Sequence, residues 1–262
     1  MGPEELSSYV QHQGLDKLFE LDVTMDYGLT GSVDPSFDQV FAPNLADLVR
    51  LHVLCVSRKV TTVLEFGCGY STAVLSHALH ANAQAHGAFV RNNLRRANAF
   101  EVHTVDNEEK YLETAKSRLP KSLSDHAHFH FSTVSMTTFD GRIVTQYDRL
   151  PNICPDLILL DGPGQHGVMG DINGISTAHP DRLPMTCDIL KFEHFLLPGT
   201  LIVVDGRAAN ARFLKTNLQR DWRYYYDQEG DVHYLELKEP PLGRLNRRQI
   251  VHCLGEKWLN DL

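Results

Sequence analysis

The residues of this chain best suited to chemistry form a glycine-rich segment, Glu65-Phe66-Gly67-Cys68-Gly69-Tyr70-Ser71-Thr72. Gly67 and Gly69 allow a tight turn and let a ligand lie close to the backbone. Ser71 can cap a following helix, whose free N–H groups then face the ligand. Glycines in this arrangement, between an apolar run and a helix, are typical of a site for a nucleoside-containing ligand.

Other polar residues end or directly follow apolar runs elsewhere in the chain: Asp106, Asn107, Ser132, Thr133, Asp161 and Asp205. Ligands of open α/β sheets bind at the carboxyl ends of the strands. If each apolar run is a strand, these side chains gather around the glycine-rich turn.

The elements that must position these residues alternate between strand and helix patterns. Strands are predicted over 61–66, 99–106, 128–131, 156–161 and 200–205, and helices over 71–80, 108–119 and 208–219. The runs 156–161 and 200–205 are nearly all apolar, as expected for strands buried on both faces. The alternation predicts a mostly parallel sheet with helices on both faces, a three-layer α/β fold.

The two ends of the chain differ from this pattern. Residues 222–227 and 232–238 flank a Gly230 turn and predict a β-hairpin. We also expect helices over 4–13, 41–59 and 247–258, and a loop over 27–35. The chain then divides into an N-terminal extension (1–40), one α/β domain (41–240) and a helical tail (241–262).

Composition narrows the function. The net charge of −8 over 262 residues makes nucleic acid a poor partner, because phosphate is repelled. The five cysteines form no C-x-x-C pair, which indicates free thiols and a reducing compartment. Without a signal-peptide pattern or a membrane-length apolar run, we expect a cytoplasmic protein that acts on a small molecule. Residues 1–40 could serve as the arm of a homodimer.

The chain resembles the class I S-adenosylmethionine-dependent methyltransferases. Their first motif, V-L-E-x-G-x-G-x-S/T, is similar to Val63–Thr72, and acidic residues end the second and fourth predicted strands at Asp106 and Asp161. The resemblance covers roughly residues 41–238. It implies a Rossmann-like fold with a seven-stranded sheet closed by the C-terminal antiparallel hairpin.

The resemblance also implies residue roles toward S-adenosylmethionine. Gly67, Cys68, Gly69 and Ser71 would hold its amino-acid part against the backbone, and Glu65 would lie near its ammonium group. Asp106 would accept hydrogen bonds from both ribose hydroxyls, since a carboxylate offers two acceptor oxygens. The adenine would be bordered by Asn107, Ser132 and Thr133, and Asp161 would complete the cofactor site.

Two features depart from common patterns. Thr72 stands where the dinucleotide fingerprint has a small residue, which argues against a nicotinamide-dependent oxidoreductase. Asp106 also lies much farther from Gly69 than the usual ~20 residues. We assign the excess to an insertion over 81–97, either a lid on the cofactor site or a surface excursion.

Catalytic residues are expected in a long glycine-rich segment from Asp161 to about His179, because long loops are often functional. Asp161 and His166 are the candidates, with His166 a general base whose pKa range suits proton removal near neutrality.

Asp161 and Asp205 also resemble the carboxylates that hold a divalent ion such as Mg²⁺ in the metal-dependent small-molecule O-methyltransferases. That group usually has Asp-Asp or Asp-Asn after the fifth strand, where this chain has Asp205-Gly206-Arg207. We therefore expect no metal. Arg207 could instead pair with one of these carboxylates or hold an anionic substrate.

Two further features have ordinary explanations. Cys68 needs only to be small, so we do not take it for a nucleophile. His126, His128 and His130 alternate, so they are expected to share one polar strand face without forming a metal site.

The sequence favours a methyltransferase acting at oxygen of a small molecule or sugar-like metabolite. A methyltransferase fold that binds without methylating is the alternative, because no catalytic base is evident. Aminopropyl transfer has thinner support, since Asp161 alone would have to supply the acidic pocket for a polyamine.

Overall fold

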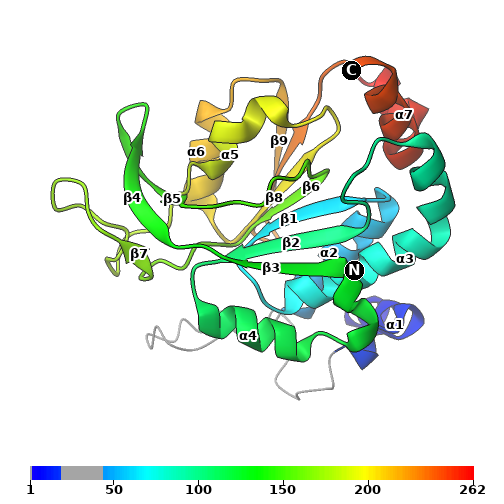
Figure 1. Cartoon of the computed structure of the whole chain (residues 1–262), viewed down its shortest axis with the longest axis horizontal. Coiled ribbons are helices and arrows are strands. Elements are labelled where there is room, and N and C mark those ends of the chain that lie inside the picture. The colour runs from blue at the N-terminus through cyan, green and yellow to red at the C-terminus, as the bar shows by residue number, and fades with distance from the viewer. Residues whose placement is uncertain (1, 19–43) are drawn as a thin grey trace.

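The computed structural model describes residues 2–18 and 44–262 and is built around a twisted seven-stranded sheet (Figure 1). In spatial order the strands are β3 (Ala127–Phe131), β2 (Glu101–Asp106), β1 (Thr62–Phe66), β6 (Leu157–Leu160), β8 (Leu201–Asp205), β10 (Val232–Leu237) and β9 (Trp222–Asp227). The first five are parallel, and β10 runs antiparallel to both its neighbours. The predicted Rossmann-like sheet with its closing hairpin is confirmed.

Helices cover both faces of this sheet. On one face α2 (Leu45–Ser57) and α3 (Tyr70–Asn93) pack on Val63, Val102 and Leu159. On the other, α5 (Asp188–Phe192) and α6 (Ala208–Asn217) pack on alternate residues of the same strands, including Leu64 and Ile158. This alternation follows from the strand period of two and produces the predicted three layers. α4 (Glu109–Arg118) connects β2 to β3.

Short helices complete both ends of the described chain. α1 (Pro3–Gln13), followed by η1 (Leu15–Lys17), packs through Leu6 and Val10 on α2. The predicted tail helix is two helices, α7 (Gly243–Leu254) and α8 (Glu256–Asn260), separated by Gly255. The loop predicted over 27–35, and the first residues of the helix predicted over 41–59, lie outside the described residues. Among the described helices, none has the length and apolar character that a membrane crossing needs.

Of the two alternatives given for the predicted insertion over residues 81–97, the structure does not show the lid. α3 continues to Asn93, so most of the segment is a helix of 24 residues that leads away from the glycine-rich turn. A helix of this length spans about 36 Å. Its far end lies against α7: the ring of Phe89 stacks on His252 at 4.2 Å, and the Asn93 carbonyl accepts a hydrogen bond from Arg248.

A second, three-stranded sheet was not predicted. β4 (Val134–Phe139) pairs with β5 (Arg142–Tyr147) and with the short β7 (Val168–Met169). The hairpin turns at Asp140 and Gly141, whose φ angles are 47° and 72°. Residues of this sheet pack with Leu64 and Val105 of the main sheet. The 3-10 helices η2 (Lys121–His126) and η3 (Glu193–Phe195) lie in connections outside both sheets.

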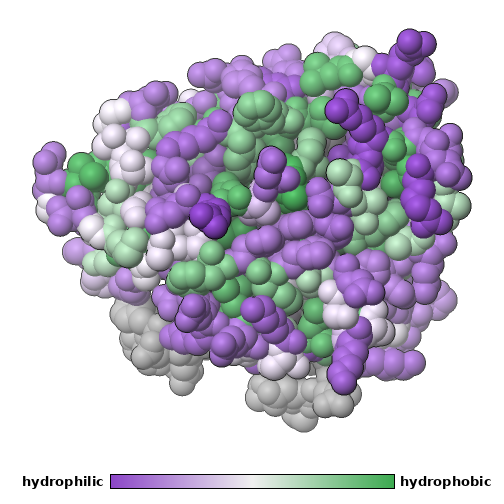
Figure 2. Space-filling model, in the orientation of Figure 1, coloured by the Kyte–Doolittle hydropathy of each residue, from purple (hydrophilic) through white to green (hydrophobic). Residues whose placement is uncertain are grey.

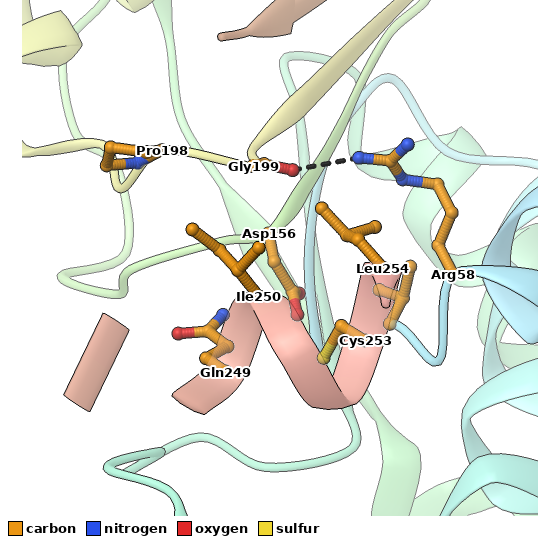
Figure 3. A pocket seen from close by; sticks show the side chains of 9 residues that line it. Arg58, Asp156, Pro198, Gly199, Gln249, Ile250, Cys253 and Leu254 are labelled. Atoms are coloured by element: carbon orange, nitrogen blue, oxygen red, sulfur yellow. Dashed lines mark hydrogen bonds between the residues drawn. The ribbon is translucent and has the colours of Figure 1, made fainter. Parts of the chain in front are cut away.

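The amino ends of the central strands are held by Asp156, which precedes β6. Its carboxylate accepts hydrogen bonds from the backbone N–H groups of Thr61 and Thr62 at 2.7–3.2 Å and from the Thr61 hydroxyl, and Arg96 lies 3.5 Å away. Figure 3 shows a pocket at this edge, where Asp156 and α7 face the Arg58–Gly199 hydrogen bond. This pocket is at the opposite end of the strands from the glycine-rich turn.

We expect Asp156→Ala to lower the free energy of unfolding by about 2–4 kcal/mol, because it leaves buried N–H donors of Thr61 and Thr62 without acceptors. Asp156→Asn retains one oxygen and should lose less. Chemical denaturation measures both, with Asp181→Ala, at a side chain 89% exposed, as the control. Equal stabilities of Asp156→Ala and this control would contradict the assignment.

Candidate ligand-binding site at the carboxyl ends of the strands

The turn after β1 lies tightly against the turn after β6. Gly67 has a φ of 88°, and a Cβ there would lie 2.8 Å from the Asp161 carbonyl oxygen. A Cβ at Gly162 would lie 2.5 Å from the Gly67 nitrogen. Both positions therefore require glycine for the close backbone contact, and Gly67 also requires it for its conformation. Gly69 differs, because no atom lies within 4 Å of a Cβ built on it.

Asp106 ends β2 and connects two loops at this edge. It is 6% exposed, and its two carboxylate oxygens accept hydrogen bonds from the N–H groups of Cys68 (3.0 Å) and Glu108 (2.8 Å). Burial raises the pKa of Asp106, and these two N–H groups oppose the rise. The Cys68 thiol is a third donor to this carboxylate, which offers about four acceptor positions in all and so can still accept from a ligand.

Glu65 is the next-to-last residue of β1, just before the turn, and is fully buried. Its two oxygens accept hydrogen bonds from the hydroxyls of Ser71 (2.6 Å) and Thr72 (2.7 Å) in the first turn of α3. Burial raises the pKa of Glu65 to about 7, although both hydroxyls act in the opposite direction. The carboxylate can therefore influence a ligand through Ser71, which is only half-buried.

Asn107 holds the loop that contains His166. Its amide nitrogen donates to the Gly167 carbonyl at 3.0 Å, and its amide oxygen accepts from the Gly164 N–H at 3.2 Å. Because both bonds fall within four residues, His166 lies between two anchored glycines on the same edge as Asp106. The structure thus brings the exposed His166 to the predicted site.

Ser132 and Thr133 follow β3 and use their hydroxyls within the protein. The buried Ser132 hydroxyl accepts from the Arg149 N–H at 2.9 Å, and the Thr133 hydroxyl bonds to Asp148. The Ser132 N–H donates to the carbonyl of Asp106 at 3.0 Å. These residues connect β3 to the end of β5, next to the ribose position predicted at Asp106.

Asp161 has a cationic partner within the chain. The Arg207 guanidinium lies 3.3 Å from the Asp161 carboxylate, donates to the carbonyl of Pro163 at 2.9 Å and also bonds to the Asp161 carbonyl. The pairing that the sequence offered as one role for Arg207 is confirmed, and these three contacts engage its guanidinium.

The surroundings of Asp161 and Asp205 do not fit Mg²⁺. Arg207 already places a positive charge at Asp161. Burial, together with the carboxylates of Asp47 and Asp161, raises the pKa of Asp205 to about 7. A hard divalent cation prefers several ionised oxygen ligands, so this arrangement is a poor donor set for it.

Tyr147, at the end of β5, was missed by the sequence analysis. Its ring lies 5.5 Å from that of Phe66, and its hydroxyl is buried beneath Gly162 with no hydrogen-bond partner among the described residues. The signal that could have found it is Asp140-Gly141 between two β-branched runs, which is a hairpin pattern.

Two expectations on single side chains can be compared with the structure. Burial and the nearby Asp106 carboxylate raise the pKa of the Cys68 thiol far above its usual value, so it remains protonated and is a poor nucleophile. The shared face of His126, His128 and His130 is wrong for His126, which lies in η2 and hydrogen-bonds to His80 of α3.

Solved structures of several methyltransferases align with most of this chain at low sequence identity. No family model matches it, and no curated protein matches its sequence. The O-methyltransferase TomG from Streptomyces achromogenes, solved with SAM, shares 19% identity over 90% of each chain, with a TM-score of 0.41. An O-methyltransferase from Bacillus cereus, solved with SAH, shares 12% over 90% of this chain and 92% of its own (TM-score 0.37). The N-methyltransferase NodS from Bradyrhizobium japonicum shares 15% over 87% and 98% (TM-score 0.35). At these values the function must be inferred from the chain's own residues.

The buried Glu65 predicts a pH dependence of stability. Its pKa rises from 4.5 in the unfolded chain to about 7 in the folded one. Between these values the unfolded chain releases the proton and the folded chain keeps it, so the free energy of unfolding falls as pH rises. The loss attributable to Glu65 is on the order of 3 kcal/mol at most.

Denaturant unfolding of the wild type and Glu65→Gln at pH 5 and pH 8 measures this loss. The variant cannot titrate, so its stability relative to the wild type should increase from pH 5 to pH 8. Glu113→Gln, at an exposed position on α4, is the control and should follow the wild type. Parallel profiles for Glu65→Gln and the wild type would show that Glu65 is ionised in the folded chain.

Proposed function

We propose that the chain binds S-adenosylmethionine at this edge of the sheet and transfers its methyl group to an oxygen of a small molecule or sugar-like metabolite. The observation that carries the proposal is the Asp106 carboxylate, which two backbone N–H groups hold beside the glycine-rich turn. In this position its remaining lone pairs suit the two adjacent hydroxyls of a ribose. The match of Val63–Thr72 to the methyltransferase motif supports the same cofactor.

The residues present fit the cofactor. The open space beside Gly69 lets a ligand lie against the backbone, and α3 begins directly after it. Amide groups in the first turn of a helix favour polar and anionic atoms, such as a carboxylate. The Ser71 hydroxyl, which donates to Glu65, can accept a hydrogen bond from an ammonium group.

When bound, the sulfonium supplies an already activated methyl group, so the chain needs mainly to align the acceptor. His166, anchored by the contacts of Asn107 with Gly164 and Gly167, would remove the proton from the acceptor hydroxyl. Asp161, oriented by Arg207, would hold a hydroxyl of the acceptor or the amino-acid part of the cofactor. Alignment of this kind can account for much of a rate enhancement.

The cofactor assignment is tested with Asp106→Asn, which keeps the size of the side chain and removes one charged acceptor. We expect calorimetric titration with S-adenosylmethionine to show at least tenfold weaker binding. Tenfold corresponds to ~1.4 kcal/mol, close to the net contribution of one hydrogen bond to a charged group. Asp140→Asn, in the exposed β4–β5 turn, should bind as the wild type does. Unchanged affinity of a folded Asp106→Asn variant would refute the ribose assignment.

The catalytic assignment is tested with His166→Gln. Loss of a general base should reduce kcat by about 10²-fold or more, with cofactor affinity unchanged. The assay is transfer of labelled methyl groups to a panel of hydroxylated small molecules, with His194→Gln, at an exposed histidine outside this segment, as the control.

Wild-type turnover in His166→Gln would exclude His166 as the base. Cofactor binding by the wild type without turnover on any acceptor would favour the alternative, a methyltransferase fold used as a binding module.

A further inference from the structure

Four side chains with metal-binding chemistry meet on the sheet edge formed by β2 and β3. The parallel register places His103 of β2 directly opposite His128 of β3. Glu101 lies two residues before His103, and His130 two residues after His128, so all four share one face of the sheet. We call Glu101, His103, His128 and His130 the β2–β3 cluster.

This face is open at the cluster. The second sheet packs with Val105 in the carboxyl half of β2. In the other half the side chains of Glu101 and His128 remain 25% and 41% exposed. Figure 2 shows hydrophilic residues gathered over β2 and β3 in the orientation of Figure 1, where both strands face the viewer. An ion from solvent can therefore reach the cluster.

The donor atoms of three residues already converge. The Glu101 carboxylate oxygen Oε2 lies 2.8 Å from His103 Nε2 and 3.6 Å from His128 Nε2. One ligand atom from each residue lies within 4.8 Å of the others, the one such group found in the described part of the chain. Zinc lies about 2.0–2.1 Å from each ligand atom, which places tetrahedral ligand atoms about 3.3 Å apart. Movements of roughly an ångström or less in these side chains would therefore bring the three donor atoms to zinc-binding distances.

One of these donors has no other use in the protein. His128 Nε2 is inaccessible to solvent and has no hydrogen-bond partner among the described residues. A buried polar atom left unpaired in this way costs free energy that a metal bond would recover. The unpaired His128 Nε2 beside Glu101 is therefore a second observation that indicates a ligand, in addition to the clustering of the donor atoms.

The remaining neighbours would orient the ligands. His130 Nε2 lies 3.1 Å from His103 Nδ1, and the Asn98 amide donates to Glu101 Oε2 at 2.9 Å. Metal-bound histidines commonly hydrogen-bond through their second ring nitrogen, which sets the ring orientation and the tautomer. His130 is placed to do this for His103.

We propose that Glu101, His103 and His128 bind a zinc ion, with solvent as the fourth ligand and His130 as a positioning residue. On binding, the ion takes the place of the proton on His103 Nε2, and Nδ1 takes up a proton that it donates to His130 Nε2. The ring stays neutral and no net proton is released. Because two ligands come from β2 and one from β3, the ion would hold the edge strand β3 to the sheet. The site is separate from the proposed methyl-donor site and does not depend on it.

The test is calorimetric titration of ZnCl₂ into the tag-free, chelator-treated full chain at pH 7.5. We expect one equivalent to bind and to raise the thermal unfolding midpoint. His128→Gln should weaken binding at least tenfold, and because the side chain is 41% exposed, this variant should keep the fold. Glu101→Gln should act in the same way, whereas His130→Gln should weaken binding by about 10–100-fold through the orientation of His103.

Two controls separate this site from others. His80→Gln removes the neighbouring His80–His126 pair, whose ring nitrogens lie 3.1 Å apart, and should leave zinc affinity unchanged. Asp106→Asn should also leave it unchanged, whatever its effect on S-adenosylmethionine. Wild-type zinc affinity in His128→Gln, or loss of binding only in His80→Gln, would overturn the proposal.

Discussion

The close contact between the turns after β1 and β6 is the constraint on which the site depends. Gly67 and Gly162 face each other with no room for a Cβ on either, so the carboxyl ends of the two central strands meet backbone to backbone. This contact sets where the chain leaves each strand. It therefore decides that α3 begins beside an open space at Gly69, and that Asp161 follows β6 next to the same turn.

Around this contact, hydrogen bonds and one ion pair hold three carboxyl groups in place. Asp106 accepts from two backbone N–H groups, Glu65 from two hydroxyls, and Asp161 faces the guanidinium of Arg207. Carboxylates fixed in this way are oriented before a ligand arrives, which lowers the entropy that binding would otherwise cost. At the opposite edge the carboxylate of Asp156 has a purely structural role, because strand N–H groups occupy it.

The errors of the sequence analysis share a physical cause. Residues 81–93 lack a strong apolar period, yet they remain helical, with Val90 buried and Phe89 and Asn93 in contact with α7. The β4–β5 hairpin carries a local signal at Asp140-Gly141, but it lies in a segment that a simple strand–helix alternation does not require. His126 has the strand spacing of its neighbours and still leaves their face, because η2 directs it to α3.

The sequence by itself determined the layered α/β fold, the glycine-rich turn, and the acidic residues at the end of β2 and directly after β6. These features depend on local periodicity and on the conformational freedom of glycine, and both can be recognised in a short stretch of sequence. Only the tertiary structure decided that Arg207 pairs with Asp161, that Asn107 anchors the His166 loop and that His103 lies opposite His128. Such pairings join residues far apart in the chain, and they follow from strand order, register and packing, which no local pattern encodes.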